Sequence, residues 1–582
     1  MATTNSPQPN FQYGFPIPGP QFPTPQKVMD SIFFLSESDW QSAREQEQFD
    51  YIIIGSGFCS LAFAQRTLTQ NPWAKILILE RGPFFLPEHF QNLPLPYQHA
   101  LGGLSETFPW MLSSKTAMQP AGNIQFQRGM VPFFGGRSIM WSAWCPRPTE
   151  EEMKYWPEEI IEAAKAHFQS AEELLNVIPA DRVDSDLSPD VLEHVGSQRP
   201  VYGLMQIELQ KMLAANLKKI PSATRSMAAP LAASAGIPQG VDFAKFSVPS
   251  AMLNLATAQS DLVKDDCGSP LKMAGDCVVN RIYQQDGVAT ALDTSRGVVK
   301  VGDAKIILAM GTLPATTLIL NSFPQVNKAG ERFTAHFITS IVARIPRKDF
   351  AFGKKLSDLE LAAIYMAGAN PQSGMQYHVQ LSVLSDKNPE QNAQKAERYM
   401  PDVVATASIK QLRTSEDYLV FVCAALGEMD FNNPENYLRL NSGTDPTTNV
   451  TVQAIANTTD LQTWGTMDEG TFQMLETVLS PRGRPGVQYW HGKTPDEGSW
   501  SNERPAIEQR RVGGLVHEGS TLWISQGEEG VVGLDYRPHG VENVYVTGGG
   551  LWPASGSWNP TMTMVALAQD LADKLLSQSN HA

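Results

Sequence analysis

Residues 49–60 read Phe49-Asp50-Tyr51-Ile52-Ile53-Ile54-Gly55-Ser56-Gly57-Phe58-Cys59-Ser60. Residues 51–54 are apolar and β-prone, as is typical of a buried parallel strand. Gly55 permits a tight turn after this strand, and apolar residues at helical spacing between Leu61 and Leu68 predict a helix after the turn. Residues 75–79 predict a second apolar strand, which ends at Glu80. The stretch therefore predicts a βαβ unit and an α/β fold.

The order of strand, glycine turn, helix, strand and acid is typical of a dinucleotide site. Gly57 lets the backbone approach a pyrophosphate, whose charge lies at the N-terminus of the following helix. Ser60 replaces the third glycine of the usual pattern with another small residue. Glu80 lies 25 residues after Gly55, near the separation of about 20 at which an acid binds the ribose hydroxyls. The alternative is a βαβ unit that has a glycine turn and no ligand.

Two further residues of this unit are ambiguous. Arg81 would suit a 2′-phosphate, but Glu80 beside it argues against one, so an exposed arginine at the strand end is the favoured interpretation. Cys59 lies inside the glycine turn, where small-residue packing is its expected role.

Composition bounds the class of protein. The 582 residues exceed one ordinary core, and 42% apolar with 18% charged residues are typical of a globular chain. The formal net charge of −15 argues against nucleic acid and anionic membrane surfaces as partners. No apolar run is long enough for a transmembrane helix. The first residues lack the features of a secretory signal, and five scattered cysteines fit a reducing compartment, so we expect a cytoplasmic protein.

The middle of the chain returns to strand character. Residues 276–283 and 297–301 predict a small β-meander, and residues 305–311 predict another buried strand. That strand ends in glycine and could bring Gly311 back to the nucleotide. A plain strand-to-helix turn is the equally weighted alternative.

The remaining patterns predict a second domain. Residues 151–180 predict a helix, and residues 418–425, 437–440 and 449–452 predict strands in a turn-rich region. We therefore expect a mainly antiparallel substrate domain. The predicted division is a proline-rich arm at 1–45, a discontinuous nucleotide-binding domain at 46–150, 251–345 and 505–582, and a substrate domain at 151–250 and 346–504.

Near the end of the chain a further strand leads into a glycine-rich segment. Residues 541–547 predict the strand, and Gly548-Gly549-Gly550 follows it, where close approach of a ligand is again possible. Asn559-Pro560-Thr561 then opens a helix, with the proline near its first position. The N-terminus of that helix carries a partial positive charge.

His517 is the candidate general base. It lies 42 residues before Asn559, whose amide can donate to or accept from a substrate hydroxyl. Histidine is the side chain best suited to take a proton near neutral pH. A lone histidine in a glycine-rich loop is more often structural, and His336, His378 and His539 have no stronger support.

These motifs together resemble the glucose–methanol–choline (GMC) family of flavin oxidoreductases, most closely its pyranose-oxidase-like branch. The resemblance rests on the first glycine turn with Glu80, and on Gly135-Gly136-Arg137-Ser138-Ile139-Met140-Trp141-Ser142. It also rests on Ala309-Met310-Gly311-Thr312 and on the His517 and Asn559 segments. It spans residues 49–575, and the C-terminal block is its most specific part.

The resemblance implies a Rossmann-like domain that binds FAD and a pair of active-site residues, His517 and Asn559, at the flavin N5 side. It places Ser142 near the N5–O4 edge and the backbone of Val278 near the adenine. The implied cofactor-binding residues are Gly55, Ser56, Gly57, Cys59, Ser60, Glu80, Arg81, Gly135, Gly136, Ser138, Trp141, Ser142, Val278, Ala309, Gly311, Gly549, Gly550, Asn559, Pro560 and Thr561.

The chain departs from the family pattern at two positions. Some pyranose oxidases attach FAD covalently through a histidine, and the matching residue here is Met140, so we expect non-covalent FAD. Many members have an acid at the end of the last strand, where this chain has Gly548. No metal site is predicted.

The leading functional hypothesis is oxidation of an alcohol, such as a sugar, glycoside or secondary-metabolite hydroxyl, to a carbonyl. The electron acceptor is left open between oxygen and a quinone-like compound, and a homo-oligomer is possible. The alternatives are a non-redox lyase that uses His517 as acid and base, and a flavin-binding protein without turnover. Four tryptophans, Trp141, Trp144, Trp552 and Trp558, could stack on a ring-shaped substrate, although core packing is at least as good an explanation.

Overall fold

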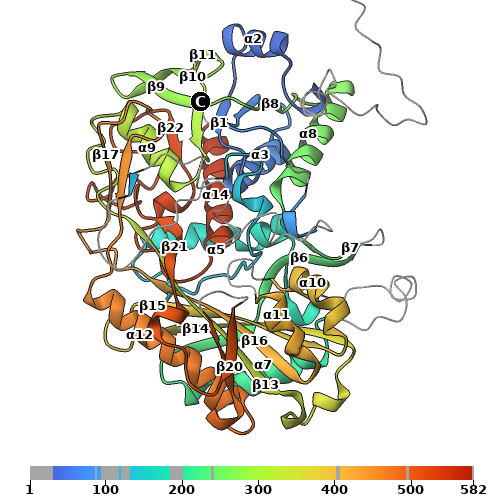
Figure 1. The fold of residues 1–582 in the computed structure, drawn as a ribbon. Coiled ribbons are helices and arrows are strands. Elements are labelled where there is room, and N and C mark those ends of the chain that lie inside the picture. The colour runs from blue at the N-terminus through green and yellow to red at the C-terminus, as the bar shows by residue number, and fades with distance from the viewer. Residues whose placement is uncertain are drawn as a thin grey trace, which may run out of the picture.

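The structure is a computed structural model that describes residues 31–85, 88–92, 117–118, 131–183, 201–237, 241–401, 407–492 and 497–579. A parallel sheet with its helices forms one end of the molecule, and a larger antiparallel sheet forms the other (Figure 1). This division confirms the predicted α/β fold class. None of the helices in the described ranges is long and apolar enough to cross a membrane.

The parallel sheet has five strands in the order β22-β12-β1-β2-β8. The predicted βαβ unit is its centre, because α3 connects β1 to β2 and β12 pairs with the other edge of β1. All four residues of β1 and of β2 are buried, which explains why both strands are continuous apolar runs. The strands are β1 (Tyr51–Ile54), β2 (Ile76–Leu79), β8 (Lys272–Ala274), β12 (Lys305–Leu308) and β22 (Val544–Val546).

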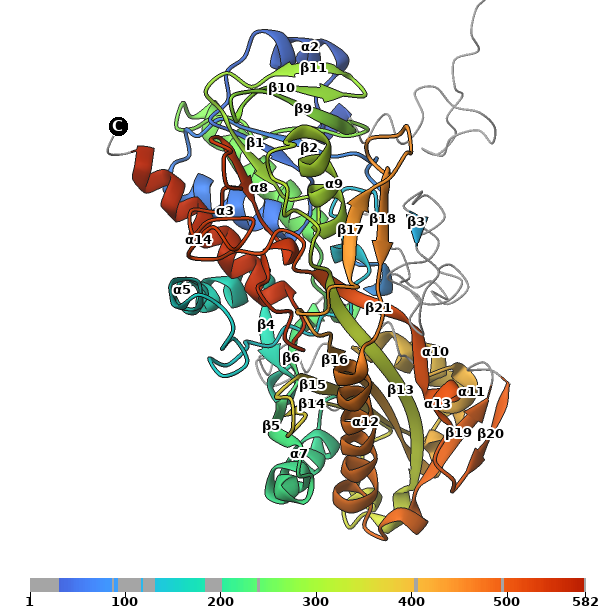
Figure 2. The same cartoon turned by 90° about the vertical axis from the view of Figure 1, so that its left-hand side faces the viewer.

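Helices cover this sheet. The C-terminal helix α14 packs against α3 and α5, and the three lie side by side in Figure 2. The helices of this half are α2 (Glu37–Glu45), α3 (Phe58–Gln70), α5 (Glu158–Leu175), α8 (Val248–Lys264), α9 (Thr312–Ser322) and α14 (Thr561–Ser579). Helix α2 occupies the last part of the predicted proline-rich arm, whose first 30 residues lie outside the described residues.

Two predicted elements have different bounds. The helix predicted over 151–180 begins only at Glu158, after Pro157, and ends before Asn176, which has a left-handed backbone. The meander has three strands, β9 (Val279–Gln285), β10 (Val288–Thr294) and β11 (Gly297–Lys300). Its first strand begins three residues later than predicted, and its first turn uses Asp286 and Gly287 at positive φ, as a tight hairpin requires.

The large sheet is antiparallel, in the order β20-β19-β13-β16-β15-β14-β5, with β21 also paired to β13. Its strands are β5 (Ala223–Ala228), β13 (Thr334–Pro346), β14 (Leu359–Ala369), β15 (Gln376–Asp386), β16 (Tyr418–Glu428), β19 (Gln488–Gly492), β20 (Gly498–Ser501) and β21 (Arg511–Gly519). The predicted strand at 418–425 is therefore a central strand, β16.

Both faces of this sheet are covered. On one face α7 (Leu204–Asn216) and α12 (Thr458–Gln473) share a core with β13, β14, β15 and β16, and α12 lies along β13 in Figure 2. The other face packs against α10 (Pro389–Tyr399), α11 (Ile409–Leu412) and strand β6. The smaller elements are β3 (Ala117–Met118), β4 (Val177–Pro179), β6 (Pro230–Ile237), β7 (Val241–Lys245), β17 (Tyr437–Leu440), β18 (Val450–Gln453) and α13 (Ile507–Arg510).

The two halves share strands across the predicted boundaries. Strand β13 begins at Thr334 and β21 ends at Gly519, and both ranges were expected to belong to the nucleotide-binding domain. In the structure both strands lie in the large sheet. The exact domain boundaries stay a prediction.

Candidate active site

One face of the large sheet presents a row of buried polar side chains near its end. Because side chains alternate along a strand, His336, His378, Gln380 and Glu428 lie on the same face of β13, β15 and β16. His336 pairs with Glu428 across β13 and β16, and His378 pairs with Leu426 across β15 and β16. All four side chains are buried.

His517 joins this row through a β-bulge. Strand β21 pairs with β13 as Thr334↔Gly519 and His336↔Val516, so β21 has one more residue than β13 between these pairs. His517 lies within the bulge and has a φ of +62°, which is uncommon for a residue with a Cβ. It was predicted to lie in a glycine-rich loop, but it lies in a strand. The bulge turns its ring towards His336, and the two Nδ1 atoms are 2.9 Å apart.

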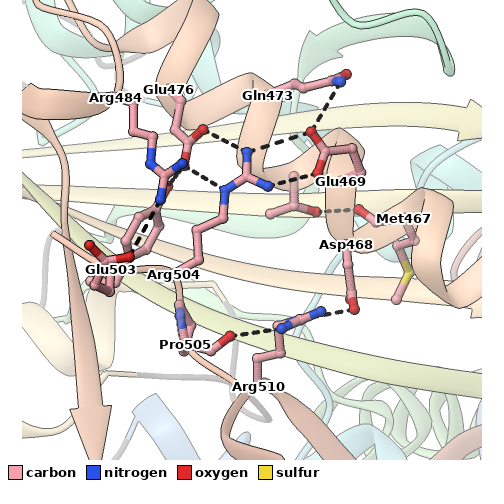
Figure 3. A network of polar contacts seen from close by, with 12 residues as sticks. Met467, Asp468, Glu469, Gln473, Glu476, Arg484, Glu503, Arg504, Pro505 and Arg510 are labelled. Carbon is pink, nitrogen blue, oxygen red and sulfur yellow. Dashed lines mark hydrogen bonds and ion pairs between the residues drawn. The ribbon is translucent and has the colours of Figure 1, made fainter. Parts of the chain in front are cut away.

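A polar network fixes the beginning of β21. Arg510 and Arg511 both donate to Asp468 of α12, at 2.9 and 3.0 Å, and the other carboxylate oxygen of Asp468 accepts from Thr339 of β13. Figure 3 shows Arg510 beside Asp468, and Arg504 between Glu469 and Glu476. The strand that bears His517 is thereby tied to α12.

Asn559 is held by contacts of the segment that precedes α14. The indole of Trp156 donates to the carbonyl of Ala554 at 3.0 Å. The buried Glu428 carboxylate accepts from the backbone N–H of Gly556 at 3.0 Å. The Gln380 amide donates to Oδ1 of Asn559 at 2.9 Å. Asn559 itself is buried.

Burial sets the charge of this cluster. It lowers the pKa of His336 to about 4, and it lowers the pKa of His378 and of His517 well below the ordinary value. Neighbouring His336, His378 and Arg137 lower the pKa of His517 further. Burial also raises the pKa of Glu428 to about 7. The three imidazoles are therefore neutral near pH 7, the form in which a histidine can accept a proton.

An ion pair lies beside His517. Arg137, in the short 3-10 helix of residues 136–139, donates to both carboxylate oxygens of Glu518. The backbone carbonyl of Glu518 accepts from the hydroxyl of Thr312, the first residue of α9. The two contacts of Glu518 therefore link β21 to the 3-10 helix at Arg137 and to the beginning of α9 at Thr312.

A long cavity runs between the halves. Its empty volume, with the open solvent at its mouth included, is about 1700 Å³. Glu80, Arg81 and Val278 line it, and so do His517 and Asn559. The two predicted active-site residues therefore open onto the same cavity as the glycine turn.

Most of the predicted cofactor-binding residues line this cavity: Gly55, Ser56, Gly57, Cys59, Glu80, Arg81, Gly136, Trp141, Ser142, Val278, Ala309, Gly311, Gly549, Asn559, Pro560 and Thr561. Four do not, namely Ser60, Gly135, Ser138 and Gly550. Gly135 donates its N–H to the Ser56 hydroxyl, and Ser138 donates to the Gly135 carbonyl. Gly135 and Ser138 therefore stabilise the glycine turn through hydrogen bonds without lining the cavity.

Residues 432–568 match the family model described as GMC oxidoreductase. The fold is similar to that of pyridoxine 4-oxidase from Mesorbium loti, with a TM-score of 0.54, 14% identity, and coverage of 92% of this chain and 100% of that chain. It is also similar to that of formate oxidase from Aspergillus oryzae RIB40, in a structure concerned with FAD modification. There the TM-score is 0.54 and the identity 15%, and 92% of this chain and 99% of that chain are covered. A search of the curated proteins found no match.

Residues 432–568 are therefore similar to the GMC oxidoreductase family, and the two solved structures share the fold of the chain. The matched segment contains both His517 and Asn559. FAD is the cofactor of this family. The pyranose-oxidase-like branch stays a prediction.

The cavity fits FAD. Helices α3, α9 and α14 all begin at its wall, so their partial positive charges converge on it, as suits a pyrophosphate and a reduced flavin. A Cβ on Gly55 would lie 2.5 Å from the Ala309 carbonyl oxygen, so the glycine lets β1 and β12 meet closely. A Cβ on Gly311 would meet no protein atom within 4 Å, which leaves the cavity free for a ligand.

Glu80, the predicted ribose-binding acid, lines the cavity. One carboxylate oxygen accepts from the backbone and hydroxyl of Ser56, and the other accepts from the Gly82 N–H at 3.0 Å. Burial raises the pKa of Glu80 to about 7. The same carboxyl therefore shapes the glycine turn and faces the cavity.

The tryptophans divide into two groups. Trp141 and Trp144 line the cavity. Trp552 and Trp558 are buried and pack in a cluster with Trp156, with ring centroids 4.7 Å and 6.0 Å from the Trp156 ring. For these two, core packing is the better interpretation.

The sequence gives His336 and His378 no more support than any lone histidine, and no sequence pattern singled out Gln380 or Glu428. His378 and Gln380 alternate with Tyr377, Val379 and Leu381 in the sequence. Polar residues at every second position of a strand signal a polar face. Here that face is buried, and the pattern alone does not say which other strand completes it.

Proposed function

We propose that this protein is a GMC oxidoreductase that oxidises the hydroxyl of a small-molecule alcohol to a carbonyl. The observation that carries the proposal is that a neutral imidazole, His517, and an oriented amide, Asn559, open onto one cavity with the glycine turn of a dinucleotide fold. Oxygen or a quinone-like compound is the proposed final electron acceptor.

His517 is the proposed general base. Its lowered pKa keeps the ring neutral, so a ring nitrogen can take the hydroxyl proton of the alcohol. FAD, when bound, supplies the acceptor for the hydride that leaves the alcohol carbon. The bulge fixes the ring of His517 before the substrate arrives, which lowers the entropy cost of reaching the reactive geometry.

Asn559 is the proposed partner of the alcohol oxygen. Its Oδ1 already accepts from Gln380, so its Nδ2–H groups remain to donate to that oxygen. A donated hydrogen bond stabilises the oxygen as its proton leaves for His517. Base and donor therefore act on the same atom from two elements, β21 and the start of α14.

FAD is proposed to bind without a covalent bond. Met140, at the position where some relatives carry the linking histidine, is buried against Phe90, Val131 and Ile139 and does not line the cavity. Its thioether offers no nucleophilic nitrogen. Release of free FAD on acid or heat denaturation of the protein, followed by filtration, tests this directly, and flavin retained by the denatured chain would contradict it.

Rapid mixing tests the roles of the two residues. General-base catalysis contributes about 10²–10⁴-fold, so His517→Ala should slow anaerobic reduction of bound FAD by that factor with FAD affinity retained. Asn559→Asp is the second variant. It keeps the size of the side chain but removes the Nδ2 donors, and it should also slow the reduction. Reduction at the wild-type rate in His517→Ala would refute the assignment.

A further inference from the structure

The contact between His517 and His336 joins two identical atoms. Nδ1 of one ring lies 2.9 Å from Nδ1 of the other, and the rings meet edge to face at 84°. Both rings are neutral, so one Nδ1 must carry a proton and the other must accept it. The direction of this hydrogen bond decides what His517 presents to the cavity.

The role proposed for His517 decides the direction. His336 is 1% exposed, and its Nδ1 faces Nδ1 of His517 at 2.9 Å. A general base needs an unprotonated nitrogen free for the substrate, and in His517 that nitrogen is Nε2, because Nδ1 is engaged with His336. The proton of His517 then lies on Nδ1, and the proton of His336 lies on Nε2.

A neutral imidazole has one N–H. With the proton of His336 on Nε2, its Nδ1 is a lone pair and accepts from Nδ1–H of His517. Nε2 of His517 is then the lone pair that remains. The opposite tautomer would turn His517 into a donor at Nε2, which cannot take a proton.

We propose that His336 is a positioning residue that holds His517 as the Nδ1–H tautomer, so that Nε2 of His517 accepts the proton of the alcohol. This inference rests on the proposed function of His517. His336 does not line the cavity, so it acts through His517 and does not touch the substrate.

The hydrogen bond between His517 and His336 also stabilises the state that follows proton transfer. A protonated His517 still donates from Nδ1 to His336, and a hydrogen bond from a cation is about twice as strong as one between neutral groups. Because burial disfavours charge on His336, the proton stays on His517. The imidazole pair therefore supports both states of the base without a carboxylate partner.

Nuclear magnetic resonance of the full, FAD-loaded chain reads the tautomer directly. Histidines labelled with ¹⁵N distinguish a protonated from an unprotonated ring nitrogen, and His517→Asn identifies the His517 signals by their loss. We expect a protonated Nδ1 and an unprotonated Nε2 for His517 at neutral pH. A proton on Nε2 of His517 in the wild-type protein would overturn the inference.

Variants of His336 test its role. His336→Leu removes the acceptor, and we expect the His517 tautomer to change and flavin reduction to slow about 10²-fold, the lower end of the general-base contribution. His336→Asn places an amide oxygen near the former Nδ1 and should restore both. His378→Leu is the matched control, because His378 is an equally buried imidazole whose Nε2 contacts Gln380 and not His517, and it should leave the His517 tautomer unchanged.

The outcomes separate the two proposals. If no alcohol reduces the flavin, the proposed function fails, but the NMR spectrum still reports the tautomer. If His517→Ala abolishes reduction while His336→Leu reduces as fast as wild type, only the inference fails. Should His336→Leu not fold, the wild-type spectrum and the His336→Asn variant decide the question.

Discussion

Gly311 offers a sharp test of where the cofactor lies. The residue follows β12 and precedes α9 at a φ of +83°, it lines the cavity, and a Cβ on it would meet no protein atom within 4 Å. A methyl group there would enter only the space of the cavity. Gly311→Ala should therefore weaken FAD binding through a clash between the methyl group and the cofactor, an effect that is absent from the apoprotein.

The magnitude follows from the local geometry. Gly311 has a ψ of 170°, so its backbone lies in a region that is essentially restricted to glycine, and an alanine there costs about 1–3 kcal/mol in the folded state. Gly302, with a φ of +57° and also no atom within 4 Å of its Cβ, lies in an exposed turn that does not line the cavity. Gly302→Ala is therefore the control for backbone strain: it should also destabilise the apoprotein, and it should leave FAD affinity unchanged.

Two assays separate these effects. Thermal unfolding of the apoproteins should show a loss of stability for both Gly311→Ala and Gly302→Ala. Titration with FAD should give at least a tenfold weaker dissociation constant for Gly311→Ala alone, or about 1.4 kcal/mol. Equal FAD affinity in Gly311→Ala and Gly302→Ala would refute the reasoning and make Gly311 a plain strand-to-helix turn.

Three further predictions concern stability and positioning. Because burial lowers the pKa of His336 from 6.5 to about 4, the unfolded chain takes up a proton that the folded chain does not, and stability falls as pH falls. Between pH 7 and 5 this costs about 2 kcal/mol, so thermal scans of the apoprotein should show a steeper acid loss for wild type than for His336→Leu; parallel losses would contradict the burial effect. Glu428→Leu leaves the N–H groups of Gln376 and Gly556 without an acceptor, at a cost of about 1–3 kcal/mol each, and should slow flavin reduction because the segment before Asn559 relaxes; unchanged melting and reduction would exclude this role. Asp573→Asn weakens the two-point contact with Arg66 that joins α14 to α3 and should lower the melting temperature near pH 7. Because the pKa of Asp573 is lowered to about 2, that difference should shrink as pH falls below about 4, and a pH-independent difference would argue against the ion pair.

The parallel sheet was predictable because its strands carry a local signature. The strands at 51–54, 75–79 and 305–308 are short apolar runs, and two of them end in a glycine or an acid. Fully buried strands cannot carry polar residues on either face, so composition alone identifies them. The order of these strands and the intervening helix then predicts the glycine turn and Glu80 as parts of a nucleotide site.

The large sheet was predicted only in part. Strand β14 reads Leu359–Ala369 with four alanines, a composition that favours helix by local propensity. Packing against β15 and β5 on its two edges overrides that propensity. Strand β13 lies between β16 and β21, whose pairing depends on partners far along the sequence.

The candidate site likewise depends on strand pairing that the sequence does not specify locally. His517 and Asn559 stand in recognisable segments, but His336, His378 and Gln380 reach them through strand register. A one-residue shift of β13 or β15 would turn these side chains to the other face. The bulge at His517 is likewise a product of pairing with β13, because nothing in residues 513–519 specifies an extra residue.

The central claim is that His517 and Asn559 act on an alcohol beside a bound flavin. Anaerobic addition of sugars, glycosides, aryl alcohols and polyketide-type alcohols to the FAD-reconstituted protein, followed at the flavin absorbance band, tests it most directly. We predict stoichiometric FAD uptake and bleaching of the flavin by at least one class of alcohol. Failure to take up FAD would contradict the claim, and so would conversion of an alcohol without any bleaching, as a non-redox lyase would give.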